Sequence, residues 1–275
     1  MENKIFIDIL KLIQPVRIEP KLRLGREFDG GYVLSEKLLN ESDLLISFGI
    51  NNEWSFESDF FRKKDNSTLL MFDDQFESKA IYINVLKGFI ASFYRIGNNQ
   101  VRNSLKNNLK LLHSWIDFIK SNPFRVKYLK ARIGHNIENN EISLGDIILK
   151  YGIKNKQNIL LKIDIEGSEY EIVEEMVVNN RYFSGVVIEF HDVHSKPQLF
   201  KEMIELLKTK FTIEHVHFNN YTPYNGFISD ALELTLIHNK FYDNKGVPID
   251  KLPLEGFDFA CNSQLPDYDI IFEAK

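Results

Sequence analysis

The chain alternates between nearly continuous apolar runs and segments in which apolar residues recur at helical spacing. The apolar runs are DLLISFGI (43–50), TLLMFDD (68–74), FRVKYLKARIG (124–134), NILLKIDI (158–165) and SGVVIEFHDVH (184–194). Such runs are typical of parallel strands that are covered on both faces. The segments with helical spacing are 4–13, 54–62, 142–152, 166–180 and 197–208. This alternation of strand and helix predicts an α/β fold built on one doubly wound sheet.

The last two strands are expected to pair differently from the others. FTIEHVHFNN (211–220) and ALELTLIHN (231–239) are separated by a loop that is too short for a helical crossover. Two strands joined in this way run antiparallel to each other. We therefore predict a mostly parallel sheet with an antiparallel strand near one edge.

Three further segments are expected to decorate a single domain that spans 1–275. Residues 1–42 form an N-terminal cap on the sheet, and 240–275, with three prolines, form an irregular C-terminal wrap. Residues 75–123 have helical apolar spacing throughout and are longer than one crossover requires. We interpret them as a helical insertion that shapes an acceptor site, or alternatively as two packed helices without such a role.

Composition and charge exclude several classes of protein. Apolar residues make up 44% and charged residues 27%, so the chain is expected to fold throughout. The net charge of −5 argues against general nucleic-acid binding, although Arg102, Lys106 and Lys110 recur at helical spacing as a basic stripe or a solvated face. The lone Cys261 predicts a reducing, cytoplasmic setting. No apolar run is long enough to span a membrane, and the N-terminus lacks the layout of a signal peptide.

The exit of the first predicted strand is where an open α/β sheet binds its ligand. Gly49 stands there alone, whereas dinucleotide-binding loops place three glycines to clear the backbone for a pyrophosphate. This favours S-adenosylmethionine, which carries no phosphate, over NAD. The second strand ends in Asp73 and Asp74, at the distance where a carboxylate accepts hydrogen bonds from ribose hydroxyls, and Asp73 is the better candidate.

The segment KIDIEGSEYE (162–171) has acids at a strand exit and in the following helical turn. Asp164 leaves the strand, Glu166 and Gly167 form the turn, and Glu169 lies where the helix dipole favours an anion. Because acids beside a cofactor pocket gain little solvation, they are unexpected as purely structural residues. Asp164 is the strongest single candidate for a functional residue.

Several motifs together resemble the FkbM-type methyltransferase family. They are DGGYVL (29–34), SFGINNEWSFE (47–57), KIDIEGSEYE (162–171), VVIEFHDVH (186–194) and HVHFNNY (215–221). The resemblance implies a Rossmann-like methyltransferase fold and use of S-adenosylmethionine, often for O-methylation of sugar hydroxyls. It also implies site residues, namely cofactor contacts at Phe48, Gly49 and Asn51, ribose recognition at Asp73, and acids at Asp164 and Glu166.

Four of the seven histidines fall in two short clusters. Glu189 and His191 lie two apart on a strand and so face the same way, toward the neighbouring Asp164. In one interpretation, His191 is a general base, and Asp164 and Glu166 complete the catalytic set. In the other, Asp164, Glu189 and His191 hold Mg²⁺ or Mn²⁺. His215 and His217 repeat the spacing, but they can equally serve only as hydrogen-bonding partners at the sheet edge.

The sequence thus predicts an O-methyltransferase that acts on a hydroxyl of a sugar or glycan precursor, such as a capsule or lipopolysaccharide unit. The partner is a small molecule or glycan, and neither a nucleic acid nor a membrane span is expected. Two alternatives are a methyltransferase for a lipid or protein acceptor and a non-catalytic S-adenosylmethionine-binding protein of a glycan pathway. The particular sugar and the oligomeric state are not encoded in any recognisable pattern.

Overall fold

The computed structural model describes residues 2–75, 78–94, 99–121, 124–134, 141–153, 158–243 and 246–272. Within them, the largest sheet has seven strands in the order β10-β11-β9-β8-β3-β4-β5. Their bounds are β3 (Leu44–Phe48), β4 (Thr68–Phe72), β5 (Val126–Leu129), β8 (Ile159–Ile163), β9 (Phe183–Phe190), β10 (Phe211–Phe218) and β11 (Leu232–His238).

The strand directions confirm the predicted sheet. β5, β4, β3, β8 and β9 are parallel, whereas β11 runs antiparallel between β9 and β10. From β3 the chain first adds strands on one side, β4 and β5, and later places β8 and β9 on the other. The order therefore reverses between β3 and β8, which is the point where doubly wound sheets bind ligands.

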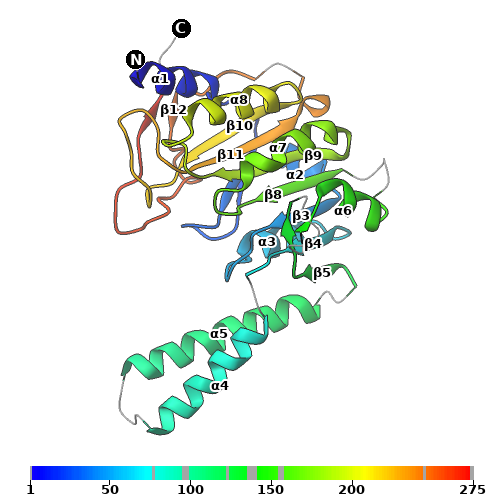
Figure 1. Ribbon diagram of the computed structural model, residues 1–275, viewed down its shortest axis with the longest axis vertical. Coiled ribbons are helices and arrows are strands. Elements are labelled where there is room, and N and C mark those ends of the chain that lie inside the picture. Colours follow the sequence, from blue (N-terminus) through cyan, green and yellow to red (C-terminus); the bar gives the residue numbers. More distant parts are fainter. Residues whose placement is uncertain are drawn as a thin grey trace.

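Two apolar clusters pack against the sheet, and Figure 1 shows the helices that contribute to them. One cluster joins Ile46 and Leu161 to helices α1 (Glu2–Leu12), α6 (Leu144–Lys150), α7 (Glu169–Val178) and α8 (Pro197–Lys208). The other joins Leu45 and Leu160 to α2 (Glu36–Asn40) and α3 (Ser55–Lys63). Since side chains alternate along a strand, neighbouring residues of β3 and β8 serve opposite faces, which explains their unbroken apolar runs.

Short strands form three two-stranded sheets outside the central sheet. They are β1 (Lys21–Leu24) with β2 (Tyr32–Ser35), β6 (Arg132–Ile133) with β7 (Glu141–Ile142), and β12 (Lys251–Leu252) with β13 (Ile270–Ile271). Single-turn helices follow at Asn180–Tyr182 and Asn239–Phe241. The predicted C-terminal wrap thus contains one short strand pair, and β2 packs against β10 and β11 as part of the N-terminal cap.

Two strand boundaries differ from the prediction. The second strand ends at Phe72 rather than Asp74, because the Asp73 side chain turns back to accept backbone N–H groups. The predicted strand over 124–134 divides into β5 and β6, which belong to different sheets. Ser143 caps α6, and its hydroxyl accepts the N–H of Asp146.

The 75–123 segment forms two helices that project from the domain (Figure 1). They are α4 (Ser78–Tyr94) and α5 (Asn99–Ser121). The C-terminal end of α5 is anchored by Trp115, whose ring contacts Trp54 at 5.0 Å and Tyr128 at 5.8 Å between centroids. A role of this pair in shaping an acceptor site stays a prediction.

Candidate active site

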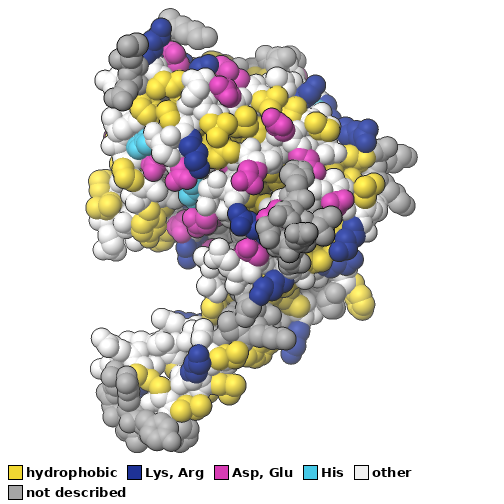
Figure 2. Space-filling view, viewed as in Figure 1, with side chains coloured by type: hydrophobic (Ala, Val, Ile, Leu, Met, Phe, Trp, Pro, Cys, Tyr) yellow, Lys and Arg dark blue, Asp and Glu magenta, His cyan; other side chains and the backbone are white. Residues whose placement is uncertain are grey.

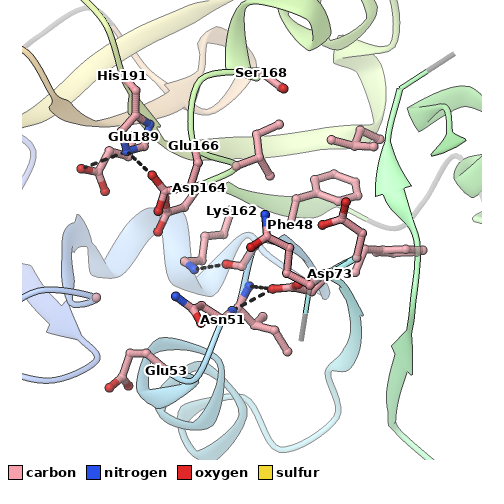
Figure 3. Close-up of a pocket in the computed structure, with 18 of the residues that line it drawn as sticks. Phe48, Asn51, Glu53, Asp73, Lys162, Asp164, Glu166, Ser168, Glu189 and His191 are labelled. Atoms are coloured by element: carbon pink, nitrogen blue, oxygen red, sulfur yellow. Dashed lines mark hydrogen bonds and ion pairs between the residues drawn. The ribbon is translucent and has the colours of Figure 1, made fainter. Parts of the chain in front are cut away.

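A cavity of about 460 Å³ opens at the carboxyl ends of β3, β4, β8 and β9 (Figure 3). The predicted site residues that line it are Phe48, Gly49, Asn51, Asp73, Asp74, Asp164, Glu166, Glu189 and His191. Of the described residues between 75 and 123, only Gln75 contributes to the lining. The parallel strands therefore bring residues from four distant segments to one edge of the sheet.

Gly49 is required by the close approach of two strand exits. Its φ is +74°, in the left-handed region, and a Cβ atom at this position would lie 1.6 Å from the carbonyl oxygen of Asp164. Asn51, two residues on, also has a positive φ of 43°. Backbone conformations of this kind concentrate at functional sites because surrounding contacts hold them there.

Asp73 holds this loop with its carboxylate. The N–H groups of Ile50 and Asn51 donate to Oδ2 at 2.9 and 2.8 Å, and the N–H of Gln75 donates to Oδ1 at 2.8 Å. The side chain is buried, whereas that of Asp74 is exposed. The first role of Asp73 is thus to fix the loop, a role that sequence reasoning did not assign.

A buried ion pair supports the same loop from below and was missed in the sequence. The Lys162 ammonium donates to the carbonyl oxygen of Gly49 at 3.0 Å and lies 3.5 Å from the carboxylate of Glu57. Burial alone would lower the pKa of Lys162, but Glu57 and Asp164 outweigh it and raise the pKa above its usual value. Lys162 therefore stays charged and carries positive charge beneath the cavity.

Asp164 lies at the centre of the cavity wall. Burial raises the pKa of its carboxyl to about 6, against the opposing effects of the Lys162 and His191 charges. The hydroxyl of Tyr32 donates to Oδ2 across 3.4 Å. At neutral pH, Asp164 is therefore largely ionised but close enough to its pKa to exchange a proton.

His191 is oriented by a carboxylate. Its Nδ1 lies 3.0 Å from Oε1 of Glu169, a fully buried side chain that also accepts the N–H of Gly167. Burial alone would lower the pKa of His191, but the hydrogen bond with Glu169 and the charges of Glu189 and Asp164 raise it to about 9. Glu169 entered the sequence interpretation only as an acid at a helix start, and its contact with His191 requires the fold.

Glu189 is a neighbour of His191, with 3.8 Å between Oε1 and Nε2, and it accepts the side-chain amide of Asn219 at 2.8 Å. Burial, with the adjacent Asp164 and Glu233 charges, raises the pKa of Glu189 well above its usual value. Around His191, the possible metal-ligand atoms that lie within 4.8 Å of one another belong to Asp164, Glu166 and His191, and a second such group, away from this cavity, comprises His217, Glu233 and Cys261. The predicted metal ligands were Asp164, Glu189 and His191. Among the described residues, the group around His191 whose atoms lie close enough to share an ion contains exposed Glu166 and does not contain Glu189.

His215 and His217 are placed away from the cavity. His215 pairs with Asp258 at 2.8 Å, and His217 contacts Glu233 at 2.9 Å and Asp267 at 3.0 Å. All of these contacts tie β10 to β11 and to the C-terminal segment. These contacts are of the hydrogen-bonding kind considered for the two histidines at the sheet edge.

Comparisons with known proteins were made for both sequence and structure. Residues 16–219 match the model of the family described as "Methyltransferase FkbM domain". A search of curated protein sequences gives no significant match.

Among solved structures, similar folds include a precorrin-6y C5,15-methyltransferase from Geobacter metallireducens, with 13% identity and a TM-score of 0.35 over 74% of this chain and 84% of that one. The 16S rRNA methyltransferase KamB has 9% identity and a TM-score of 0.33 over 79% and 100%. The O-methyltransferase NcsB1 from neocarzinostatin biosynthesis, in complex with S-adenosylhomocysteine, has 10% identity and a TM-score of 0.26 over 70% and 49%.

Proposed function

The chain belongs to the FkbM family of S-adenosylmethionine-dependent methyltransferases, and on this premise we propose that it methylates a hydroxyl group of a sugar or glycan precursor. The observation that carries the proposal is His191 at the cavity wall with its Nδ1 held by buried Glu169. A sugar hydroxyl has a pKa far above 7, so its methylation needs a base of this kind.

The cavity suits the cofactor chemically. Phe48, Phe72 and Ile133 supply apolar wall for a flat aromatic base, and Gly49 leaves its backbone open to close approach. Asp164 and Glu189 face the same space with acidic groups that favour a sulfonium cation. The cofactor supplies an electrophilic methyl group on that sulfonium.

For the ribose we propose Asp73 and Asp74 together. The buried carboxylate of Asp73 lines the cavity where β4 ends, and exposed Asp74 offers further acceptor oxygens at the same rim. Ribose hydroxyls would donate to carboxylate oxygens placed there.

Replacing Asp73 with alanine should weaken both the fold and cofactor binding. Three loop N–H groups lose their acceptor, which should destabilise the protein by about 1–3 kcal/mol, and cofactor affinity should fall by a similar free energy. Asp74→Ala is the matched control, expected to change cofactor affinity but not the melting temperature. Thermal melts and calorimetry with S-adenosylmethionine measure both, and an Asp73→Ala protein with normal stability and affinity would contradict the assignment.

The chain's own residues then act on the acceptor. Nε2 of neutral His191 would take the proton from the acceptor hydroxyl, whose oxygen would receive the methyl group that the bound cofactor supplies. Glu169 fixes the ring orientation and stabilises the imidazolium that results. The charge of Asp164 raises the pKa of His191 further and so also favours the protonated ring.

Polar residues in the cavity lining support a sugar acceptor. They comprise Asp29, Glu53, Ser168, Asn219, Tyr221 and Thr222. Tyr221 is 61% exposed, so its aromatic face is accessible for stacking on a pyranose. A long lipid chain would instead require an apolar channel, which the described lining does not provide.

Turnover assays test the proposal directly. Formation of S-adenosylhomocysteine is followed with nucleotide sugars, with glycan oligomers, and with lipid and peptide acceptors as alternatives. Activity on sugars is expected, whereas activity confined to lipids or peptides would overturn the acceptor class. Cofactor binding without turnover on every acceptor class would favour a non-catalytic role.

A divalent ion is the alternative means of activating the hydroxyl, favoured only by the grouping of Asp164, Glu166 and His191. We expect turnover to survive dialysis against EDTA, since Glu169 already orients the base. Loss of activity that Mg²⁺ or Mn²⁺ restores would establish the metal instead, and His191 as a ligand would favour Mn²⁺. The control is His191→Ala, whose residual turnover should not respond to either treatment.

A further inference from the structure

The projecting helices α4 and α5 expose apolar residues on a part of the molecule that lies away from the sheet. On α4, Tyr82, Ile83, Leu86, Phe89 and Ile90 are 44–61% exposed. Figure 2 shows hydrophobic side chains gathered along this pair of helices. Clustered exposed apolar surface of this kind marks a site of interaction with a partner or a membrane.

The same two helices carry positive charge in an otherwise acidic chain. Their sequences contain six Lys or Arg residues and one acid, Asp117, whereas the whole chain has a net charge of −5. Arg102, Lys106 and Lys110 form an exposed stripe on α5. The basic residues noted in the sequence therefore belong to the projecting pair.

The apolar and basic stripes face the same side. Val85 is buried and Gly88 packs on Leu105, so these residues mark the faces on which α4 and α5 meet. Successive residues of an α-helix are about 100° apart around the helix axis. By this count, the exposed apolar residues of α4 lie roughly a third of a turn from the contact face of α4. The basic residues of α5 lie roughly a third of a turn from the contact face of α5, in the same rotational sense. Because the helices run antiparallel (Figure 1), equal rotations bring both stripes to one side of the pair.

From this geometry we propose that α4 and α5 dock the enzyme on the surface of an anionic lipid bilayer. Apolar side chains of α4 enter the headgroup boundary, and the lysines and arginine of α5 attract the lipid phosphates. Apolar and basic side chains on one side of the pair match the two layers of such a surface, the acyl boundary and the anionic headgroups, and a second copy of this chain is an outcome that the test distinguishes. No described helix is long and apolar enough to cross the bilayer, so the contact is interfacial.

One end of the docking surface, at Lys110, approaches the candidate active site. A second cavity of about 750 Å³ lies between α3 and α5, is lined by Lys110 and Asp117, and shares Glu53 with the first cavity. The C-terminal end of α5 is anchored to the domain by the ring contacts of Trp115 with Trp54 and Tyr128. Docking would therefore bring the active-site cavity near acceptors carried at the membrane surface. This part of the inference rests on the proposed function.

Co-sedimentation of the full chain with vesicles tests the proposal. Binding is expected to vesicles of phosphatidylglycerol and phosphatidylcholine, to be weak on pure phosphatidylcholine, and to fall as salt is raised. Leu86→Ser combined with Ile90→Ser should reduce binding more than tenfold. Lys106→Gln combined with Lys110→Gln should reduce it by about fivefold for each charge removed.

The controls separate docking from folding and from catalysis. Leu149→Ser, at a residue of α6 that is 79% exposed, removes a similar side chain elsewhere and should leave vesicle binding unchanged. All variants should keep their melting temperature and their affinity for S-adenosylmethionine. Three results would overturn the proposal. The wild type could fail to bind anionic vesicles, or it could bind them no better than both double variants do. The chain could also self-associate in a way that Leu86→Ser with Ile90→Ser abolishes.

Discussion

Replacing His191 with alanine is expected to lower turnover by roughly 10²–10⁴ while affinity for S-adenosylmethionine stays near normal. The residue has a buried orienting partner in Glu169 and lies beside Asp164 at the cavity wall. Loss of the base leaves proton removal to water, whereas the residues proposed to contact the cofactor do not include His191. His194→Ala is the matched control, because the Nε2–H of His194 donates to the carbonyl oxygen of Ile228 at 3.0 Å and the residue does not line the cavity.

The pH profile identifies which group acts as the base. The pKa of His191 is about 9, so the ring is protonated and inactive as a base below that pH, and kcat/KM should rise through about 9. If Asp164 is the base, kcat/KM should instead rise through about 6 and then level off. A rise through 6 that persists in His191→Ala would transfer the role to Asp164.

Glu169→Gln tests the positioning role separately. The substitution keeps the shape of the side chain but removes the negative charge that raises the pKa of His191. The midpoint of the profile should therefore move to lower pH, in addition to any loss of turnover from a less well oriented ring. A purely structural Glu169 would lower stability without moving that midpoint.

The sheet could be predicted because each of its central strands has a distinctive pattern of apolar residues in its own short stretch of sequence. β3 and β8 are buried on both faces, and this demands the unbroken apolar runs that stand out at 44–48 and 159–163. The short connection between β10 and β11 likewise excludes a parallel crossover. The position of α4 and α5 could not be predicted in the same way, since periodicity indicates a helix but not the surface on which it packs.

The site was predicted in part for the same reason. Strand ends identify Gly49, Asp164 and His191, because parallel strands direct their carboxyl ends to one edge. The ion pair of Lys162 with Glu57 joins residues that lie on different elements, and nothing local marks either side chain as buried. Long-range partners of this kind decide which acid orients a base and which one holds a loop.

Asp73 illustrates how a correct position can conceal a second role. Its place after β4 suggests ribose binding, and the residue does line the cavity. The loop that follows β3 folds back so that the N–H groups of Ile50 and Asn51 point at its carboxylate. Because those N–H groups are present in every sequence, no pattern of side chains could reveal that they converge on Asp73.

Gly49→Ala is expected to destabilise the protein by on the order of 3 kcal/mol or more and to abolish measurable cofactor binding. A left-handed φ costs an alanine about 1–2 kcal/mol, and forcing apart packed atoms adds about 1–3 kcal/mol. The added methyl group would lie 1.6 Å from the carbonyl oxygen of Asp164, so the exits of β3 and β8 must separate. Both exits carry residues of the candidate site, and the hydrogen bond from Lys162 to the Gly49 carbonyl would be displaced with them.

Gly152→Ala isolates the part of this effect that belongs to the backbone alone. Gly152 has a φ of +59°, also left-handed, and a Cβ atom there would meet nothing within 4 Å. We expect it to lose about 1–2 kcal/mol of stability and to bind S-adenosylmethionine normally. Chemical denaturation and calorimetry of the two variants therefore separate conformational strain from close approach. Equal losses in both would mean that the contact between Gly49 and the Asp164 carbonyl does not constrain the site, whereas a selective loss in Gly49→Ala makes that contact the reason for a glycine at this strand exit.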